Sequence, residues 1–193
     1  WNLWLLEKRQ YMKKDEFNYL VGLLSSPCTG ETTYEFFSSA QDILKKIGGG
    51  KILELGFNRG SSCLSFLGAG FESVHSVDIR SNSEVNKSLT ILTDRYQGKF
   101  KYSSLDHSSI LENKHLFEDE YDLIFIDGDH TLSSMKRDVN TAIDFNPKYI
   151  LFDDYDHPAH RADVKKLIEL FNFEICEVYD SDCGQALIKL WKK

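Results

Sequence analysis

From residue 51 onward, short apolar runs alternate with segments of helical periodicity, and this alternation restricts the fold more than any other feature. Strands are expected at 51–55, 73–78, 99–103, 121–127 and 149–153. Between most of them, apolar residues recur three or four positions apart, which predicts helices at 61–67, 84–96, 131–145 and 159–171. Apolar strands joined by helices are typical of a parallel sheet that is covered on both faces.

The last two strands, expected at 173–179 and 185–191, have no helix between them. The turn Asp-Ser-Asp-Cys-Gly at 180–184 joins them. So short a connection permits only an antiparallel pairing. The sequence therefore predicts one α/β domain over residues 48–193, with an antiparallel hairpin at the edge of its sheet.

Residues 1–47 form a helical extension ahead of this domain. We expect helices at 1–24 and 32–47. The segment 25–33, which Pro and Gly punctuate, is a candidate lid over the site of the domain. An aromatic stripe is expected either to pack in the core or to make a subunit contact in a homo-oligomer; it comprises Trp1, Trp4 and Tyr11.

The charge balance limits the partners of the chain. Its 193 residues carry a formal net charge of −7, and nucleic-acid binding needs clustered basic residues, so nucleic acid is not the expected partner. No apolar run reaches the roughly 18 residues of a membrane helix, and the first residues do not have the pattern of a signal peptide. We expect a cytoplasmic protein without a membrane partner. The four cysteines form no C-x-x-C pair and are expected to be reduced, with a Cys176–Cys183 disulfide as the alternative.

The first strand runs into a glycine-rich turn that contains Gly56 and Gly60. Glycines permit a tight turn and close approach of a ligand, and the next helix presents free N–H groups. Asp78 ends the second strand about 20 residues further on, where a carboxylate commonly holds a ribose diol. Asn58 takes the place of the second glycine of the dinucleotide fingerprint G-x-G-x-x-G. A nucleoside cofactor without a pyrophosphate is therefore favoured over NAD, which stays as an alternative.

Carboxylates and histidines follow the other strands, at the ends where doubly wound sheets bind ligands. Asp106 and His107 follow the third strand, although this segment reads equally as a helix N-cap. The fourth strand ends in Asp-Gly-Asp-His at 127–130 and the fifth in Asp-Asp-Tyr-Asp at 153–156. Carboxylates from two neighbouring strand ends would form an all-oxygen site of the kind that Mg²⁺ prefers. The neighbouring polar residues are expected to be supporting or solvated: Asp129, Asp156, His157 and His160.

The pattern E-x-G-x-x-x-G at 54–60, together with the terminal hairpin, resembles class I S-adenosylmethionine-dependent methyltransferases over about residues 48–193. A narrower similarity lies in YDLIFIDGDHTLSSMKRDV and NPKYILFDDYDHP, which resemble the metal-dependent small-molecule O-methyltransferases of the macrocin and catechol type. The resemblance implies a Rossmann-like, doubly wound sheet of seven strands. Its strand order would be 3-2-1-4-5-7-6, with strand 7 antiparallel.

The resemblance also implies roles for individual residues. The methionine part of S-adenosylmethionine would lie against Glu54, Gly56, Asn58, Gly60 and Ser61. Asp78 would hold the ribose, and Asp106 and His107 would flank the adenine. The metal ligands would be Asp127, Asp153 and Asp154. His130 would be the general base, and Asp127 is counted with the catalytic and cofactor-binding residues as well.

We therefore expect methyl transfer from S-adenosylmethionine to a hydroxyl of a small molecule. A histidine with a pKa near neutrality can take the proton of the hydroxyl, and a divalent cation such as Mg²⁺ can lower the pKa of that hydroxyl. Two alternatives stay open. The first is metal-independent methyl transfer to nitrogen or protein, and the second is a non-catalytic module that only binds the cofactor.

Overall fold

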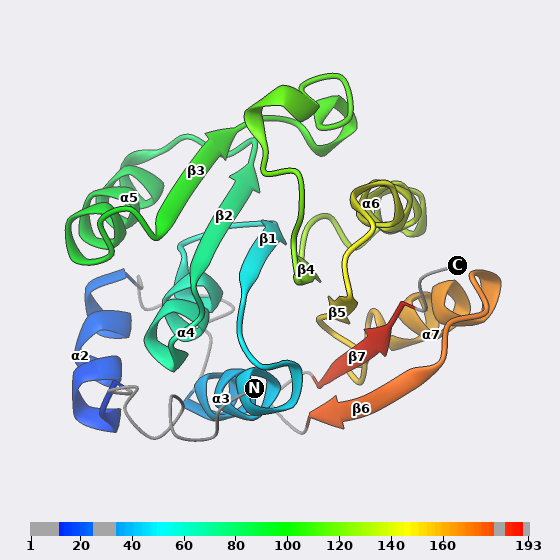
Figure 1. Cartoon of the computed structure of the whole chain (residues 1–193), viewed down its shortest axis with the longest axis horizontal. Coiled ribbons are helices and arrows are strands. Elements are labelled where there is room, and N and C mark those ends of the chain that lie inside the picture. The colour runs from blue at the N-terminus through cyan, green and yellow to red at the C-terminus, as the bar shows by residue number, and fades with distance from the viewer. Residues whose placement is uncertain (1–11, 25–33, 180–183, 191–193) are drawn as a thin grey trace.

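A computed structural model describes residues 12–24, 34–179 and 184–190 of the chain. Its centre is a seven-stranded sheet in the order β3-β2-β1-β4-β5-β7-β6 (Figure 1). The strands are β1 (Lys51–Leu55), β2 (Ser73–Asp78), β3 (Phe100–Ser104), β4 (Leu123–Ile126), β5 (Tyr149–Phe152), β6 (Ile175–Tyr179) and β7 (Gln185–Lys189). The first five pair in parallel, whereas β7 runs antiparallel to β5 and β6. The predicted fold class, strand order and direction of strand 7 are confirmed.

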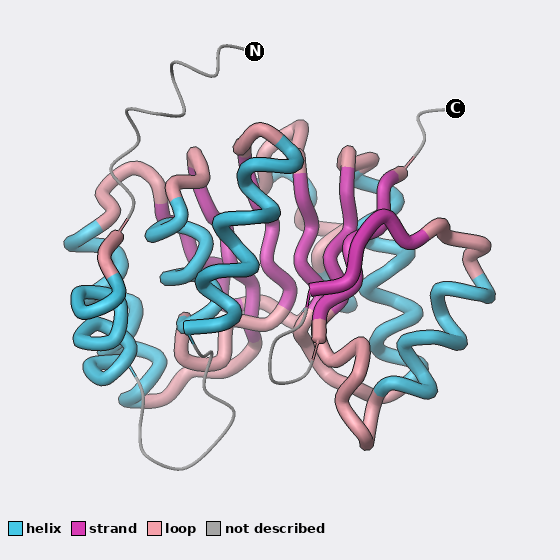
Figure 2. Tube along the Cα trace, turned by 90° about the horizontal axis from the view of Figure 1, so that it is seen from below, coloured by secondary structure: helices cyan, strands magenta, loops and turns pink. Residues whose placement is uncertain are grey.

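Helices cover both faces of this sheet (Figure 2). They are α2 (Lys14–Leu24), α3 (Tyr34–Ile47), α4 (Ser61–Ala69), α5 (Ser83–Arg95), α6 (Leu132–Phe145) and α7 (Arg161–Leu170). Buried residues of α2 to α5 form one hydrophobic cluster, and those of α6 and α7 form another. Successive strand residues alternate between the two clusters, as Ile52 and Leu53 do, because side chains of a strand point to opposite faces.

The extension packs on the sheet domain through α3. Phe36 contacts the rings of Phe66 in α4 and Phe125 in β4, each at a centroid distance of 5.6 Å. The predicted lid at 25–33, the aromatic stripe and Cys183 lie outside the described residues. Among the helices that are described, none has the length and apolar character needed to cross a bilayer.

The segment between β3 and β4 differs from the expectation, because it contains two short 3₁₀ helices, η1 (His107–Ser109) and η2 (Lys114–Leu116). Three residues are too few to show a helical period in the sequence. The fourth strand is also shorter than the predicted 121–127. Asp122 precedes it, and its side chain accepts a hydrogen bond from the backbone N–H of Lys51.

The order of the strands places a switch point between β1 and β4. From β1, the chain adds β2 and β3 on one side and β4 and β5 on the other. In open parallel sheets, ligands bind beyond the carboxyl ends of the strands at such a point. The loops that follow β1, β2 and β4 therefore meet where a ligand is expected.

Candidate active site

The loop after β1 turns tightly over the end of β4. Gly56 has a φ of 110°, and a Cβ atom at this position would lie 2.0 Å from the backbone oxygen of Asp127. Gly60 has a φ of 78°, and its Cβ atom would lie 2.6 Å from the ring of Phe57. An L side chain at either position would force its neighbours to move. The path of the backbone therefore requires both glycines of the predicted turn.

Asp78, at the end of β2, holds this loop in place. Its Oδ2 accepts hydrogen bonds from the backbone N–H groups of Phe57 at 3.0 Å and Asn58 at 2.9 Å. Its Oδ1 accepts a third from the N–H of Arg80 at 2.9 Å. Hydrogen bonds to a carboxylate are stronger than those between neutral groups. Asp78 thus shapes the loop, in addition to any contact with a ligand.

A cavity of about 540 Å³ lies between this loop and the ends of β2 and β4. Its volume is in the range of small-molecule and cofactor sites, about 300–1,000 Å³. The structure brings seven of the predicted site residues together in its lining: Gly56, Asn58, Asp78, Asp106, His107, Asp127 and His130. The sequence did not single out four further lining residues: Ile79, Arg80, Ser134 and Arg137.

Glu54, Gly60 and Ser61 are not in that lining. Glu54 is fully buried, and its two carboxylate oxygens accept hydrogen bonds from the hydroxyls of Ser62 and Ser76. Burial raises the pKa of Glu54 to about 7, and the two hydroxyls oppose this shift. The carboxylate thus lies beneath the loop, and its contact with a cofactor stays a prediction.

Asp106 and His107 differ in their surroundings. Asp106 is exposed and accepts a hydrogen bond from the backbone N–H of Ser108 at 2.7 Å, which makes it the N-cap of η1. His107 is largely buried, with Nδ1 3.0 Å from Oδ2 of Asp138 and Nε2 3.2 Å from the backbone oxygen of Val77. Burial alone would lower the pKa of His107, but the hydrogen bond and charge of Asp138 raise it above its usual value. The imidazolium form, which donates from both nitrogens, matches these two acceptors.

The carboxylates that follow β4 and β5 lie close enough to perturb one another. Burial raises the pKa of Asp127 well above its usual value, and the charges of Asp153 and Asp154 add to this effect. Burial also raises the pKa of Asp153 to about 6, although a 2.8 Å hydrogen bond from Nε2 of Gln185 opposes the shift. Like charges crowded together disfavour ionisation. A divalent cation would relieve this repulsion, although the ligand atoms of these three carboxylates do not all lie within 4.8 Å of one another.

His130 lies between two of these carboxylates. Its Nδ1 is 3.0 Å from Oδ2 of Asp154, and its Nε2 is 4.0 Å from Oδ1 of Asp127. Burial lowers the pKa of His130, whereas the charge of Asp154 raises it. His160, which we expected to be solvated or supporting, stacks on His130 at a ring distance of 4.3 Å.

Sequence reasoning missed two buried residues that orient the site, Asp138 and Gln185. Asp138 is fully buried in α6, between Met135 and Ala142 on the apolar side of that helix. A carboxylate on an apolar face was a signal, because buried charges are rare unless paired. Gln185 opens β7, and nothing in its local sequence distinguishes it from an ordinary strand residue.

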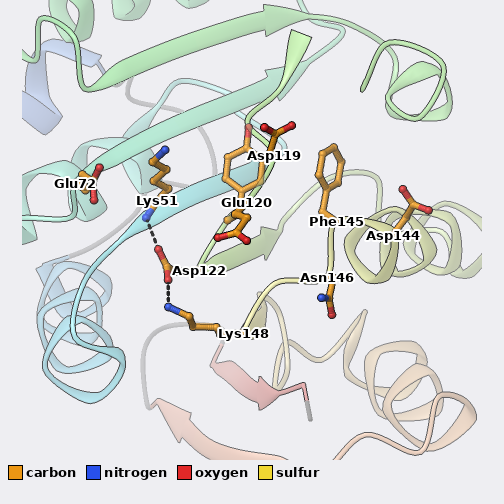
Figure 3. A pocket seen from close by; sticks show the side chains of 10 residues that line it. Lys51, Glu72, Asp119, Glu120, Asp122, Asp144, Phe145, Asn146 and Lys148 are labelled. Atoms are coloured by element: carbon orange, nitrogen blue, oxygen red, sulfur yellow. Dashed lines mark hydrogen bonds and ion pairs between the residues drawn. The ribbon is translucent and has the colours of Figure 1, made fainter. Parts of the chain in front are cut away.

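A second cavity, of about 310 Å³, lies where β1, β4 and β5 begin. Figure 3 shows Asp122 between Lys51 and Lys148 at this end of the sheet. Oδ2 of Asp122 accepts a hydrogen bond from the backbone N–H of Lys51 at 3.0 Å, and its Oδ1 accepts one from Nζ of Lys148. A Cβ atom at Gly50 would lie 1.9 Å from the same carboxylate. These contacts fasten the starts of three strands and explain Asp122 as a structural residue.

Many solved structures share this fold, and three of them illustrate it. An O-methyltransferase from Bacillus cereus in complex with S-adenosylhomocysteine superimposes with a TM-score of 0.71 and 12% identity, over 97% of this chain and 96% of that chain. An S-adenosylhomocysteine-bound methyltransferase from Podospora anserina gives a TM-score of 0.66 and 17% identity, over 98% of this chain and 93% of that chain. An N-methyltransferase from Bradyrhizobium japonicum, also with S-adenosylhomocysteine, gives a TM-score of 0.63 and 11% identity, over 90% of this chain and 97% of that chain. O- and N-methyltransferases thus share the architecture, so the fold does not select the acceptor atom.

Comparisons of sequence add the family. A search of curated proteins found no match. A family profile described as a methyltransferase domain matches residues 53–155. This range covers more than half of the chain and runs from β1, through the glycine turn, to the acidic residues after β5. The chain therefore belongs to the methyltransferase domain family.

Proposed function

We propose that this chain transfers the methyl group of S-adenosylmethionine to a hydroxyl of a small molecule, with the assistance of a divalent cation. One observation carries the proposal. Asp127 and His130 line the 540 Å³ cavity and also belong to the cluster of carboxylates and histidines after β4 and β5. A cofactor in the cavity would thus lie next to groups that can activate an acceptor.

The cofactor would supply an electrophilic methyl group on a positively charged sulfur. Asp78 can accept hydrogen bonds from the ribose hydroxyls, because each carboxylate oxygen has more than one acceptor position. The backbone at Gly56 allows close approach on the methionine side. The largely buried ring of His107 borders the cavity and would contact the adenine side. Glu54 would act through the buried hydroxyls of Ser62 and Ser76, which tie the first turn of α4 to the sheet.

His130 is the proposed base. Asp154 lies at Nδ1, which favours the tautomer with its proton on Nδ1 and leaves the lone pair of Nε2 to accept a proton. His130 would take the hydroxyl proton at Nε2 while that oxygen bonds to the methyl carbon and the carbon–sulfur bond breaks. The bonding electrons stay on sulfur, which becomes neutral. Asp154 would stabilise the imidazolium that forms.

Asp127, Asp153 and Asp154 are the proposed ligands of a divalent cation, most simply Mg²⁺, which prefers carboxylate oxygens. Such a cation would bind the acceptor oxygen and lower its pKa. Gln185 holds Asp153 in the cluster through its 2.8 Å hydrogen bond. The raised pKa values of Asp127 and Asp153 indicate how strongly these groups disfavour an uncompensated negative charge.

Two measurements test the proposal. Calorimetry with S-adenosylhomocysteine should show binding to the chain and weaker binding to Asp78→Asn. Methyl transfer to a panel of phenols, catechols and sugars should require Mg²⁺ and should fall by about 100-fold or more in His130→Ala and Asp153→Ala. Lys136→Ala, on an exposed position of α6, is the matched control and should retain turnover.

Other outcomes would identify the alternatives. Full turnover of both variants on the preferred acceptor would refute the assigned base and metal. Methylation of amines in the presence of a chelator would establish a metal-independent enzyme. Cofactor binding without methylation of any acceptor would indicate a binding module.

A further inference from the structure

Three potential metal ligands converge from two loops, the one after β4 and the one after β5. His130 follows β4, Asp154 follows β5, and His160 is the residue before α7. Oδ2 of Asp154 lies 3.0 Å from Nδ1 of His130 and 4.0 Å from Nε2 of His160. One ligand atom from each of the three residues lies within 4.8 Å of the others. This group, the His–Asp–His cluster, is distinct from the three carboxylates, with which it shares only Asp154.

These distances are close to what a small cation requires. Zn²⁺ with tetrahedral bonds of about 2.0–2.2 Å holds its ligand atoms about 3.4 Å apart. The contacts of Asp154 to His130 and His160, at 3.0 and 4.0 Å, lie on either side of that value. The rings of His130 and His160 are stacked with an interplanar angle of 22°, so one of them would also rotate to direct its nitrogen at the ion and complete three positions of a tetrahedron, with water at the fourth.

The turn after β5 brings His160 back toward Asp154. The backbone oxygen of Asp154 accepts a hydrogen bond from the N–H of His157 at 3.2 Å, and the oxygen of His157 accepts one from the N–H of His160 at 3.0 Å. The side chain of Asp154 is only 11% exposed, whereas those of His130 and His160 are 34% and 30% exposed. The carboxylate of the cluster is thus buried, whereas its two histidines leave one side open through which a cation can enter.

A carboxylate also lies near the other ring nitrogen of His130. Its other ring nitrogen, Nε2, lies 4.0 Å from Oδ1 of Asp127. Metal-bound histidines commonly present their second nitrogen to a carboxylate, which orients the ring. The same arrangement forms here after a small approach of the two groups.

We propose that His130, Asp154 and His160 bind a transition-metal dication of the Zn²⁺ type. Two imidazole nitrogens and one carboxylate suit Zn²⁺, Co²⁺ or Ni²⁺, whereas Mg²⁺ prefers oxygen ligands. The charge of Asp154 compensates half of that of the ion. The ion at this site would therefore differ in kind from the Mg²⁺ proposed for the three carboxylates.

Binding at this site would also inhibit methyl transfer, a consequence that rests on the proposed function. Coordination through Nδ1 of His130 leaves the remaining ring proton on Nε2, the atom that would accept the hydroxyl proton. Coordination by Asp154 also removes one ligand of the Mg²⁺ site. A Zn²⁺-type ion would thus block the base and compete with the activating cation.

Calorimetric titration of the full chain with ZnCl₂, in excess Mg²⁺, tests the site without any need for activity. The wild type and His157→Gln should bind Zn²⁺ alike, and His160→Gln should bind it more than about tenfold more weakly. His157 is the matched control, because its ring stacks on His160 at 4.8 Å but it is not part of the cluster. Equal Zn²⁺ affinity of His160→Gln and the wild type would refute the site.

Turnover measurements test the consequence. Zn²⁺ should inhibit the wild type and His157→Gln, and it should inhibit His160→Gln only at more than about tenfold higher concentration, with the turnover of each protein in Mg²⁺ alone as its own reference. Zn²⁺ binding that depends on His160 but causes no inhibition would preserve the site and refute the assignment of His130 as the base. If no acceptor is methylated at all, the titration still decides whether the site exists.

Discussion

Gly56 is the residue at which the cavity tolerates least change. It lies where the loop after β1 crosses the end of β4, and the backbone oxygen of Asp127 occupies the space of a side chain. Asn58, two residues further on, also has a positive φ, of 47°, which Asn adopts more readily than most residues. The conformation of this loop therefore depends on a few residues that permit unusual backbone angles.

A Gly56→Ala substitution should lower the free energy of unfolding by about 2–4 kcal/mol, since backbone strain and overpacking each contribute about 1–3 kcal/mol. It should also abolish binding of S-adenosylhomocysteine, because the loop must move away from Asp127. Gly98→Ala is the control. Gly98 has a φ of 73° but no atom within 4 Å of a built Cβ, so it should lose only about 1 kcal/mol. If denaturant unfolding gave the same loss of unfolding free energy for Gly56→Ala and Gly98→Ala, the contact with Asp127 would be unimportant.

At the scale of single residues, part of the candidate site could be predicted from the sequence. Gly56, Asp78, Asp127 and His130 were predicted because glycine turns and strand-end carboxylates have local signatures, and all four line one cavity. Glu54 belongs to the same motif, yet its side chain points to Ser62 and Ser76 instead. The direction of a strand side chain depends on which face of the sheet it occupies and on what covers it there.

At the scale of elements, η1 and α6 are joined by the buried pair of His107 and Asp138. The pair connects the segment after β3 to the helix after β4, and it borders the cavity next to Gly128. A Cβ atom at Gly128 would lie 2.8 Å from the ring of His107. The ion pair and the glycine therefore fit together as one wall of the cavity.

Asp138→Ala should lower the free energy of unfolding by about 3–5 kcal/mol, because it leaves the buried His107 without its partner. Asp144→Ala, on the same helix, breaks an exposed pair with Lys114 and should cost less than about 1 kcal/mol. Adding His107→Leu to Asp138→Ala should recover part of the loss. Denaturant unfolding of these variants measures each value, and a loss at Asp138 no larger than at Asp144 would mean that the buried pair contributes little.

Most helices and strands were predictable, because burial of one face imposes a hydrophobic period on a helix and burial of both faces makes a strand a short apolar run. Several boundaries differ from the predicted ones by one or two residues. The helix predicted from 159 begins at Arg161, after the turn at His157 to His160. The 3₁₀ helices showed no period in the sequence, because they are short and are held by tertiary contacts such as the His107–Asp138 pair, but the reading of Asp106 as a helix N-cap is confirmed at η1.

At the scale of the whole molecule, stability depends on groups buried far from the site. His75 in β2 lies between the hydroxyls of Tyr121 and Ser103, at 3.1 and 2.8 Å, and stacks on Phe117. Burial lowers the pKa of His75 to about 4. The folded chain therefore keeps this imidazole neutral at pH values where the unfolded chain protonates it.

This difference predicts a loss of stability on acidification. Above about pH 6.5 neither state binds the proton, so His75 has no effect there. Between about pH 6.5 and pH 4 only the unfolded state binds it, and the free energy of unfolding should fall by up to about 3 kcal/mol. Buried carboxylates such as Glu54 have the opposite pH dependence, so the test is the difference between wild type and His75→Gln across this range. The prediction would be contradicted if the free energies of unfolding of the two proteins differed by the same amount at every pH.

The sequence by itself determined the class of the fold and the end of the sheet at which the candidate site lies. Strand–helix alternation demands a covered parallel sheet, and parallel strands bring their carboxyl ends to one edge. Glycines and carboxylates at those ends were therefore identifiable before any contact was known.

Only the tertiary structure decided which of these side chains meet. Asp138 reaches His107, Gln185 reaches Asp153, and His160 returns to Asp154 and His130. About 30 residues of chain separate His107 from Asp138, and a similar number separates Asp153 from Gln185. No local period encodes such a contact, because it depends on how helices pack and loops turn after the sheet has formed. The same reason explains how His160, which was expected to be supporting or solvated, joins a cluster of potential metal ligands.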